Sequence, residues 1–150
     1  MNYLIKSPVV AALSLLAVVA SNAQEPLTIK SGETEHSFTV EVVAEEEDIA
    51  QGLMERESLD ANAGMLFDFA GSSTSVDMWM KDTPLSLDML FINDDGKVLA
   101  IARNTTPNSE RRIGTGMPVR AVLELNGGRA RELEIEPGST ISHRLFEDTE

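Results

Sequence analysis

The residues best suited to chemistry lie in the short segment VDMWMK at residues 76–81. Side chains alternate along a strand, so Trp79 and Lys81 are expected on one face and Met78 and Met80 on the other. An indole beside charged groups can stack against a sugar ring, an aromatic ligand or a cation. The alternative is that Trp79 fills the core and that Lys81 covers it. The segment therefore predicts either a binding surface or a core tryptophan.

The two methionines of this segment also suit a soft metal ion. Met78 and Met80, with His36 or His143 as a third ligand, would offer the thioether and imidazole donors that suit Cu(I). Methionine is also flexible packing material, and the 7 methionines are spread over several segments of the chain. A Cu(I) carrier is therefore kept as an alternative function, while no metal and no cofactor are expected.

Three carboxylates, those of Asp68, Asp88 and Glu124, lie inside apolar runs. Partial burial raises the proton affinity of a carboxylate and suits it to acid or base catalysis. Two facing carboxylates can cleave a glycosidic bond, so a glycan-directed hydrolase that uses Asp88 and Glu124 is a second alternative function. A buried ion pair with Lys81 or Arg56 is the structural alternative for these groups.

Composition and missing signatures narrow the function further. The chain has no G-x-S-x-G, H-E-x-x-H, Walker or dinucleotide-binding signature, which favours a protein without catalytic activity but does not decide the question. It contains no cysteine, so disulfides, cysteine nucleophiles and cysteine zinc sites are excluded. The formal net charge is −13, and the only local basic cluster is Arg111-Arg112. Nucleic-acid binding is not expected, because it needs a basic footprint.

The first residues carry the pattern of a secretory signal peptide. Lys6 supplies a positive charge, residues 9–20 are apolar, and the sequence SNA at residues 21–23 fits a cleavage site. We expect residues 1–23 to be removed, leaving residues 24–150 as a single β-rich domain, periplasmic or secreted and monomeric. An apolar run of about twelve residues is too short to cross a bilayer, so no membrane span is expected after cleavage.

The rest of the chain alternates between short apolar runs and turn residues, which predicts a mainly β domain. Residues 24–32 are expected to be a short leader, and residues 103–118 a long irregular stretch of the kind that often carries function. The sequence NDDG at residues 93–96 predicts a hairpin, because Asp-Gly adopts the positive backbone angles of a tight turn. The predicted strands are residues 36–42, 65–69, 76–81, 87–92, 98–103, 121–126 and 140–145.

One short helix is predicted after the first of these strands. The acidic residues 45–48 suit a helix N-terminus, and Ile49, Leu53 and Met54 recur at helical spacing. Gly52 costs a helix about 1 kcal/mol relative to alanine, which indicates close backbone packing or an early end. The expected fold class is mainly β (α+β), a compact β-barrel or β-sandwich of about six to eight short strands with one short helix.

Several segments resemble, in the same order, the sequence blocks of the domain of unknown function 192 family. They are GLMER at residues 52–56, GMLF at 64–67, WMKDT at 79–83 and LDMLFI at 87–92, with weaker matches at 122–125 and 137–138. The resemblance implies a compact β-rich fold, commonly behind an export signal, and no established activity.

The chain departs from the usual pattern of this family at three places. Asp82 stands where the family usually has asparagine, Leu85-Ser86 stands where it has Ile-Pro, and Ser139 stands where it has aspartate. These departures concern local turn geometry and the charge of any site. Five candidate residues fall on the family's motif positions: Arg56, Trp79, Lys81, Asp88 and Glu124.

The leading hypothesis from the sequence is a non-enzymatic module of the cell envelope that binds a small molecule or an envelope protein. Trp79 and its charged neighbours are its centre, because an aromatic plate beside charges is the most specific chemical feature of the chain. The residues expected to form the ligand-binding surface are Arg56, Trp79, Lys81, Asp82, Asp88 and Glu124.

Overall fold

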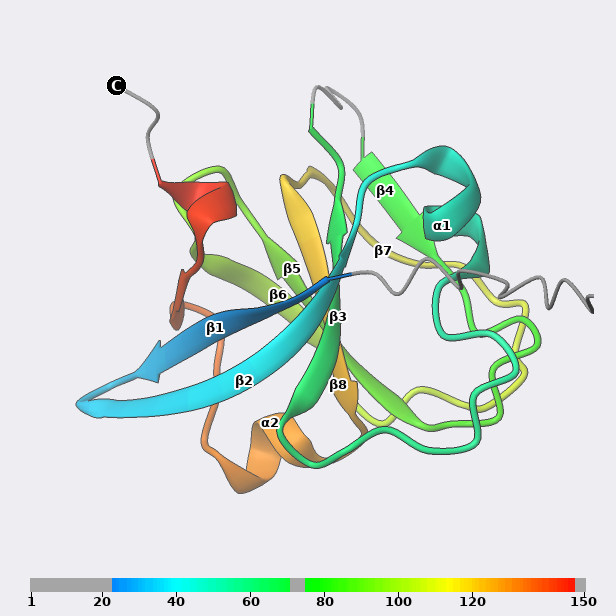
Figure 1. The fold of residues 1–150 in the computed structure, drawn as a ribbon, viewed down its shortest axis with the longest axis horizontal. Coiled ribbons are helices and arrows are strands. Elements are labelled where there is room, and N and C mark those ends of the chain that lie inside the picture. Colours follow the sequence, from blue (N-terminus) through cyan, green and yellow to red (C-terminus); the bar gives the residue numbers. More distant parts are fainter. Residues whose placement is uncertain (1–22, 71–74, 148–150) are drawn as a thin grey trace, which may run out of the picture.

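The computed structural model describes residues 23–70 and 75–147 (Figure 1). The predicted signal peptide therefore lies outside the described residues, apart from Ala23. In the described part of the chain, no helix has the length and apolar character needed to cross a bilayer.

The described residues form strands for the most part, with two short α-helices, α1 (Glu46–Gln51) and α2 (Arg129–Glu132). A 3₁₀ turn, η1 (Arg144–Phe146), follows the last strand. The strands are β1 (Gln24–Ser31), β2 (Thr34–Val43), β3 (Ala63–Asp68), β4 (Ser75–Met78), β5 (Leu87–Ile92), β6 (Val98–Ala102), β7 (Ile113–Pro118), β8 (Ala121–Asn126) and β9 (Thr140–Ser142).

Seven strands form one sheet in the order β6-β5-β8-β3-β2-β1-β9, in which only the pair β2–β3 is parallel. The two edge strands approach each other, because Lys97 and Thr140 form a bridge and the N–H of Ile141 donates to the carbonyl of Gly96 (2.7 Å). The N–H of Val98 also donates to the carbonyl of Ser139 (2.9 Å). The sheet is therefore a nearly closed barrel, which confirms the predicted fold class.

The central strands β3, β5 and β8 are covered on both faces, and every residue of β5 is buried. Inside the barrel, Leu66, Leu90 and Leu123 belong to a core that also includes Ala130 of α2, which lies at one end of the barrel (Figure 1). Outside the barrel, a second core lies beneath α1 and the paired strands β4 and β7, and it includes Met65, Phe67, Met89, Phe91 and Val122. This outer layer positions the candidate site.

Helix α1 ends where the sequence indicated it would. Gly52 has a φ of 47°, and a Cβ atom there would lie 3.2 Å from Cζ of Phe67. Both expectations for this glycine, close backbone packing and an early helix end, are confirmed. Leu53 is buried in the outer core and Ile49 packs against that core. Leu53 and Met54 follow the end of α1, so Ile49 is the only one of the three predicted apolar positions that lies on the helix.

The N-terminal segment was misjudged from the sequence. Residues 24–32 were expected to be a leader, yet β1 pairs with β2 along its whole length and with β9 on its other side. Leu27 and Ile29 alternate with polar residues and are fully buried in the inner core. This alternation was visible in the sequence, but its partner strands were not.

Four further expectations about the elements need correction. Strand β7 occupies part of the stretch 103–118, because it pairs with β4 and so lies over the barrel. The strand predicted at residues 76–81 ends at Met78, because the N–H of Met80 donates to Ser109 and its carbonyl accepts from Thr83 in a turn. Helix α2 was not predicted, and residues 140–145 divide between β9 and the turn η1.

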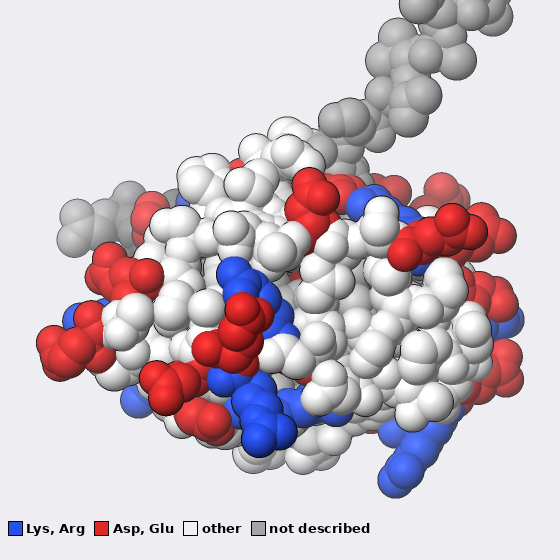
Figure 2. All heavy atoms as spheres, turned by 90° about the horizontal axis from the view of Figure 1, so that it is seen from below, with Lys and Arg blue, Asp and Glu red and all other residues white. Residues whose placement is uncertain are grey.

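The surface reflects the acidic composition without being uniformly negative. On the face shown in Figure 2, acidic side chains form scattered groups, basic side chains lie among them, and broad areas carry no charge. Local electrostatics therefore differ from the net charge of −13 and depend on which side chains the fold brings together.

Candidate functional site

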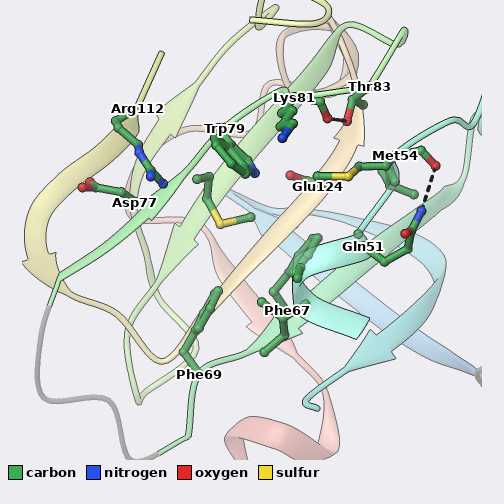
Figure 3. Close-up of a pocket in the computed structure, with 15 residues that line it drawn as sticks. Gln51, Met54, Phe67, Phe69, Asp77, Trp79, Lys81, Thr83, Arg112 and Glu124 are labelled. Atoms are coloured by element: carbon green, nitrogen blue, oxygen red, sulfur yellow. Dashed lines mark hydrogen bonds between the residues drawn. The ribbon is translucent and has the colours of Figure 1, made fainter. Parts of the chain in front are cut away.

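A cleft of about 200 Å³ opens over the outer core. It lies between the C-terminal end of α1 with the turn after it and the segments beside β4 and β7. Its walls are mainly apolar, and several polar side chains converge in it (Figure 3). The apolar lining includes Ile49, Met54, Phe67, Phe69 and Met78, and the polar lining includes Asp77, Trp79, Lys81, Thr83, Arg112 and Glu124.

Glu124 lies in the middle of β8 and points to the outer face, in the same row as Met65 of β3 and Met89 of β5. Only 4% of the residue is exposed. Burial raises the pKa of its carboxyl from 4.5 to about 8, because the charged form loses its water. Within the described residues this carboxyl makes no hydrogen bond or ion pair, so at neutral pH it is an unpartnered carboxylic acid that can both donate and accept.

Trp79 follows the end of β4 and is half-buried at the cleft. The Nζ of Lys81 lies 5.3 Å from the centroid of the indole, and Cζ of Arg112 lies 4.7 Å from it. Figure 3 shows Arg112 to one side of the indole and Lys81 to the other. Both cations are attracted to the ring, each by about 0.5–1 kcal/mol at an exposed site. Trp79 is therefore neither sealed in the core nor free on both faces.

The expected separation of the two faces of this segment holds only in part. Trp79 and Lys81 both line the cleft, but Met78 lines it too. Met80 is fully buried, and its Sδ accepts a hydrogen bond from Oγ1 of Thr105 (3.2 Å). Strict alternation does not apply here because the strand ends at Met78.

The turn after Trp79 uses Asp82 for its backbone. Asp82 is exposed, has a φ of 51°, and lies outside the cleft lining. Its carbonyl accepts a hydrogen bond from the N–H of Glu55 (2.7 Å), which ties the turn to the segment after α1. Asparagine and aspartate tolerate this left-handed conformation better than most residues, so Asp82 suits the turn.

Arg56 also lies outside the residues that line the cleft. Its guanidinium makes a two-pronged ion pair with Glu41 of β2, in which Nη2 lies 2.7 Å from Oε2. The carboxylate of Glu41 raises the pKa of Arg56 through this hydrogen bond. Arg56 therefore anchors the segment after α1 to the barrel.

Asp88 is completely buried at the end of the barrel that α2 closes. Its two carboxylate oxygens accept hydrogen bonds from the N–H of Asn104 and the N–H of Ala130, each at 2.8 Å. Asp88 stands opposite Leu125 of β8, whereas Glu124 stands opposite Met89, so the two carboxylates point to opposite faces of the sheet. The glycan-hydrolase hypothesis required them to face each other, and the structure contradicts that arrangement.

Among the described residues, the ligands proposed for copper do not come together at one site. Met80 is outside the cleft lining, and neither His36 nor His143 joins Met78 there. His143 instead lies against Glu25, with Nε2 3.1 Å from Oε2. Nor do the described residues contain a cluster of three or more histidine, aspartate or glutamate side chains that could hold a metal ion.

Sequence reasoning missed several residues of the cleft. Phe67 and Phe69 alternate in the predicted strand 65–69, and this pattern was a usable signal for a shared face; their rings stack with centroids 6.4 Å apart. Arg112 had no such signal. It reaches Trp79 because Met78 of β4 pairs with Ile113 of β7, which brings the residue before Ile113 beside the indole.

The model of a family described as Uncharacterized ACR, DUF192, matches residues 27–143. The chain belongs to the DUF192 family. The DUF192 blocks at residues 52–56, 64–67 and 79–83 meet around the cleft, where Gly52, Phe67 and Lys81 all line it.

Two crystal structures resemble this DUF192 protein throughout the fold. A protein from Sinorhizobium meliloti, proposed to be a transcription regulator, is 41% identical with a TM-score of 0.78, and the match covers 81% of this chain and 95% of that one. A protein of unknown function from Novosphingobium aromaticivorans is 32% identical with a TM-score of 0.79, covering 84% of this chain and 89% of that one. The comparison with curated proteins returns no match.

Proposed function

We propose that this DUF192 protein is an exported, non-enzymatic module that binds a small, partly apolar molecule in the cleft beside Trp79. The observation that carries the proposal is the carboxyl of Glu124, which lines the cleft in a residue that is only 4% exposed and makes no hydrogen bond or ion pair with the described residues. A carboxylic acid can both donate and accept a hydrogen bond. A ligand in the cleft can therefore pair with Glu124, and the apolar walls would bind the rest of the ligand.

The size of the cleft limits the ligand. Its volume of about 200 Å³ is smaller than typical drug-binding pockets and closer to cavities of about 150 Å³ that accept benzene. The side chains of Lys81 and Arg112 already lie against the indole of Trp79, so they would repel a positively charged ligand there. These features favour a neutral or negatively charged molecule with a small apolar part.

A binding role is favoured over glycan cleavage by the placement of the carboxylates. Glu124 has the raised pKa that a general acid needs, but Asp88 is on the other face and is used by Asn104 and Ala130. Glycan cleavage uses two carboxylates that flank one bond. The predicted pair therefore supports no hydrolytic mechanism.

The binding proposal is tested by a thermal-shift screen of small neutral and anionic molecules, followed by fluorescence titration. Trp79 is the single tryptophan of the chain, so its emission reports on the cleft alone. We expect a ligand at a hundred times its Kd to stabilise the protein by about 2.7 kcal/mol. Trp79→Ala and Glu124→Leu should abolish this gain, whereas Met117→Ala, an exposed apolar control outside the cleft, should preserve it. Stabilisation that survives both cleft substitutions would refute the proposal.

Export is tested separately by fractionating cells that produce the full chain. We expect the protein in the extracytoplasmic fraction, with an N-terminus at Gln24 after removal of residues 1–23. A cytoplasmic protein that retains Met1 to Ala23 would overturn this part of the proposal and leave the binding proposal intact.

A further inference from the structure

The basic cluster Arg111-Arg112 also lines a hollow outside the proposed cleft. This second hollow has a volume of about 400 Å³. We call it the basic pocket. No acidic residue of the described chain lines it, and its polar lining comprises Arg103, Asn104, Thr105, Thr106, Ser109, Arg111 and Arg112.

The basic pocket and the cleft share one residue. Arg112 lines both, and its guanidinium lies 4.7 Å from the centroid of Trp79. Met78 and Ile113, which pair between β4 and β7, hold the two hollows next to each other. The cleft and the basic pocket are therefore neighbours at Arg112.

The charge of the basic pocket opposes that of the chain as a whole. Three guanidinium groups line it, in a protein with a formal net charge of −13. Arg103 is partly committed, because its Nη2 pairs with Glu136 (2.8 Å), but its buried Nη1 has no hydrogen-bond partner among the described residues. Arg111 and Arg112 make no ion pair within the described part of the chain. One guanidinium group can donate two parallel hydrogen bonds to two oxygens of a phosphate or carboxylate. A pocket lined by three guanidinium groups therefore suits an oxyanion.

We propose that the ligand of the cleft is a small amphipathic organic anion, whose oxyanion end is held by Arg111 and Arg112 in the basic pocket. Its apolar end lies against Phe67 and Phe69 in the cleft, and Arg112 turns from the indole toward the anion. This inference rests on the proposed function, since it assigns the chemistry of the same ligand.

The test compares three probes by titration calorimetry and by Trp79 emission: hexanol, hexyl phosphate and inorganic phosphate. Hexanol offers only an apolar end, inorganic phosphate only an oxyanion, and hexyl phosphate both. We expect hexyl phosphate to bind at least tenfold more tightly than either of the others, and to change Trp79 emission because Arg112 moves. Arg111 lies outside the cleft, so Arg111→Gln should remove this advantage while hexanol binding is kept, and Arg112→Gln should remove the advantage as well.

Arg131→Gln is the matched control, because Arg131 is an exposed arginine on α2 outside both hollows. If Arg131→Gln weakens hexyl phosphate as much as Arg111→Gln, the effect is one of general charge and the inference is wrong. If hexanol binds as tightly as hexyl phosphate, the inference fails and the proposed function stands. If inorganic phosphate binds as tightly as hexyl phosphate, the two hollows are separate sites, which also overturns the inference.

Discussion

At the scale of single residues, Glu124 is the most unusual side chain of the protein. It occupies a position between Met65 and Met89 where every neighbour in its row is apolar. A carboxylic acid in such a place is kept neutral by the cost of removing its charge from water. At neutral pH the fold thus keeps a proton donor in the lining of the cleft.

Glu124 should make the stability of the protein depend on pH. Its pKa rises from 4.5 in the unfolded chain to about 8 in the folded one, so the folded protein binds the extra proton between these values. The contribution of Glu124 to the free energy of unfolding therefore falls as pH rises from about 4.5 to 8, by about 5 kcal/mol in total, and is constant above. We expect Glu124→Gln to match the wild type in urea denaturation at pH 4.5 and to exceed it increasingly up to pH 8.

The control for this measurement is Glu57→Gln, which removes the same charge from an exposed position. That variant should follow the pH profile of the wild type. Parallel profiles for the wild type and Glu124→Gln would show that Glu124 ionises normally in the folded protein.

At the scale of elements, Asp88 holds together parts of the fold that are distant in sequence. From β5 its carboxylate accepts hydrogen bonds from the segment after β6, at Asn104, and from α2, at Ala130. Helix α2 has only four residues and Gly128 at its N-cap, which supplies no side-chain cap. Asp88 takes over this role from outside the helix.

Substitution of Asp88 should therefore affect stability and not the cleft. Asp88→Ala leaves two backbone N–H groups without an acceptor, one of them fully buried, and should lower the free energy of unfolding by about 2–4 kcal/mol. Asp88→Asn keeps one acceptor oxygen and should cost less. Urea denaturation measures both effects, and Trp79 emission of the folded variants should be unchanged. A shift of that emission in folded Asp88→Asn would link Asp88 to the cleft and contradict this assignment.

At the scale of the whole molecule, the barrel supports two cores, one on each face of β3, β5 and β8. Among the residues that the structure describes, strands β4 and β7 pair only with each other, and they cover the outer core. Amides exchange slowly where backbone hydrogen bonds are buried under packed side chains. The cleft thus lies between the buried strands of the barrel and the separate pair formed by β4 and β7.

Hydrogen exchange should reveal this difference. We expect the slowest amides in β5 and β8, and faster exchange in β4 and β7, measured by mass spectrometry on the folded protein. Binding of hexyl phosphate should slow exchange in β4 and β7 and in the segment around Arg112, and leave β5 and β8 unchanged. Uniform protection across all the strands would mean that the β4–β7 pair opens only with the barrel.

Local patterns were sufficient to predict the class of fold and most of its strands. The run at residues 87–92 and the run at residues 121–126 match β5 and β8 at both ends, because strands buried on both faces are largely apolar and need no partner to be recognised. The early end of α1 followed from Gly52, and the family from short blocks of adjacent residues. Each of these depends on neighbours in the chain.

The site depended on contacts that no local pattern contains. Trp79 contacts Arg112 because β4 pairs with β7. Asp88 and Glu124 point to opposite faces of the sheet because of the register between β5 and β8. A change of one residue in that register would reverse the face to which Asp88 points, because side chains alternate with a period of two. Residue type and spacing suggested which groups could do chemistry, while the pairing of distant strands decided which of them meet.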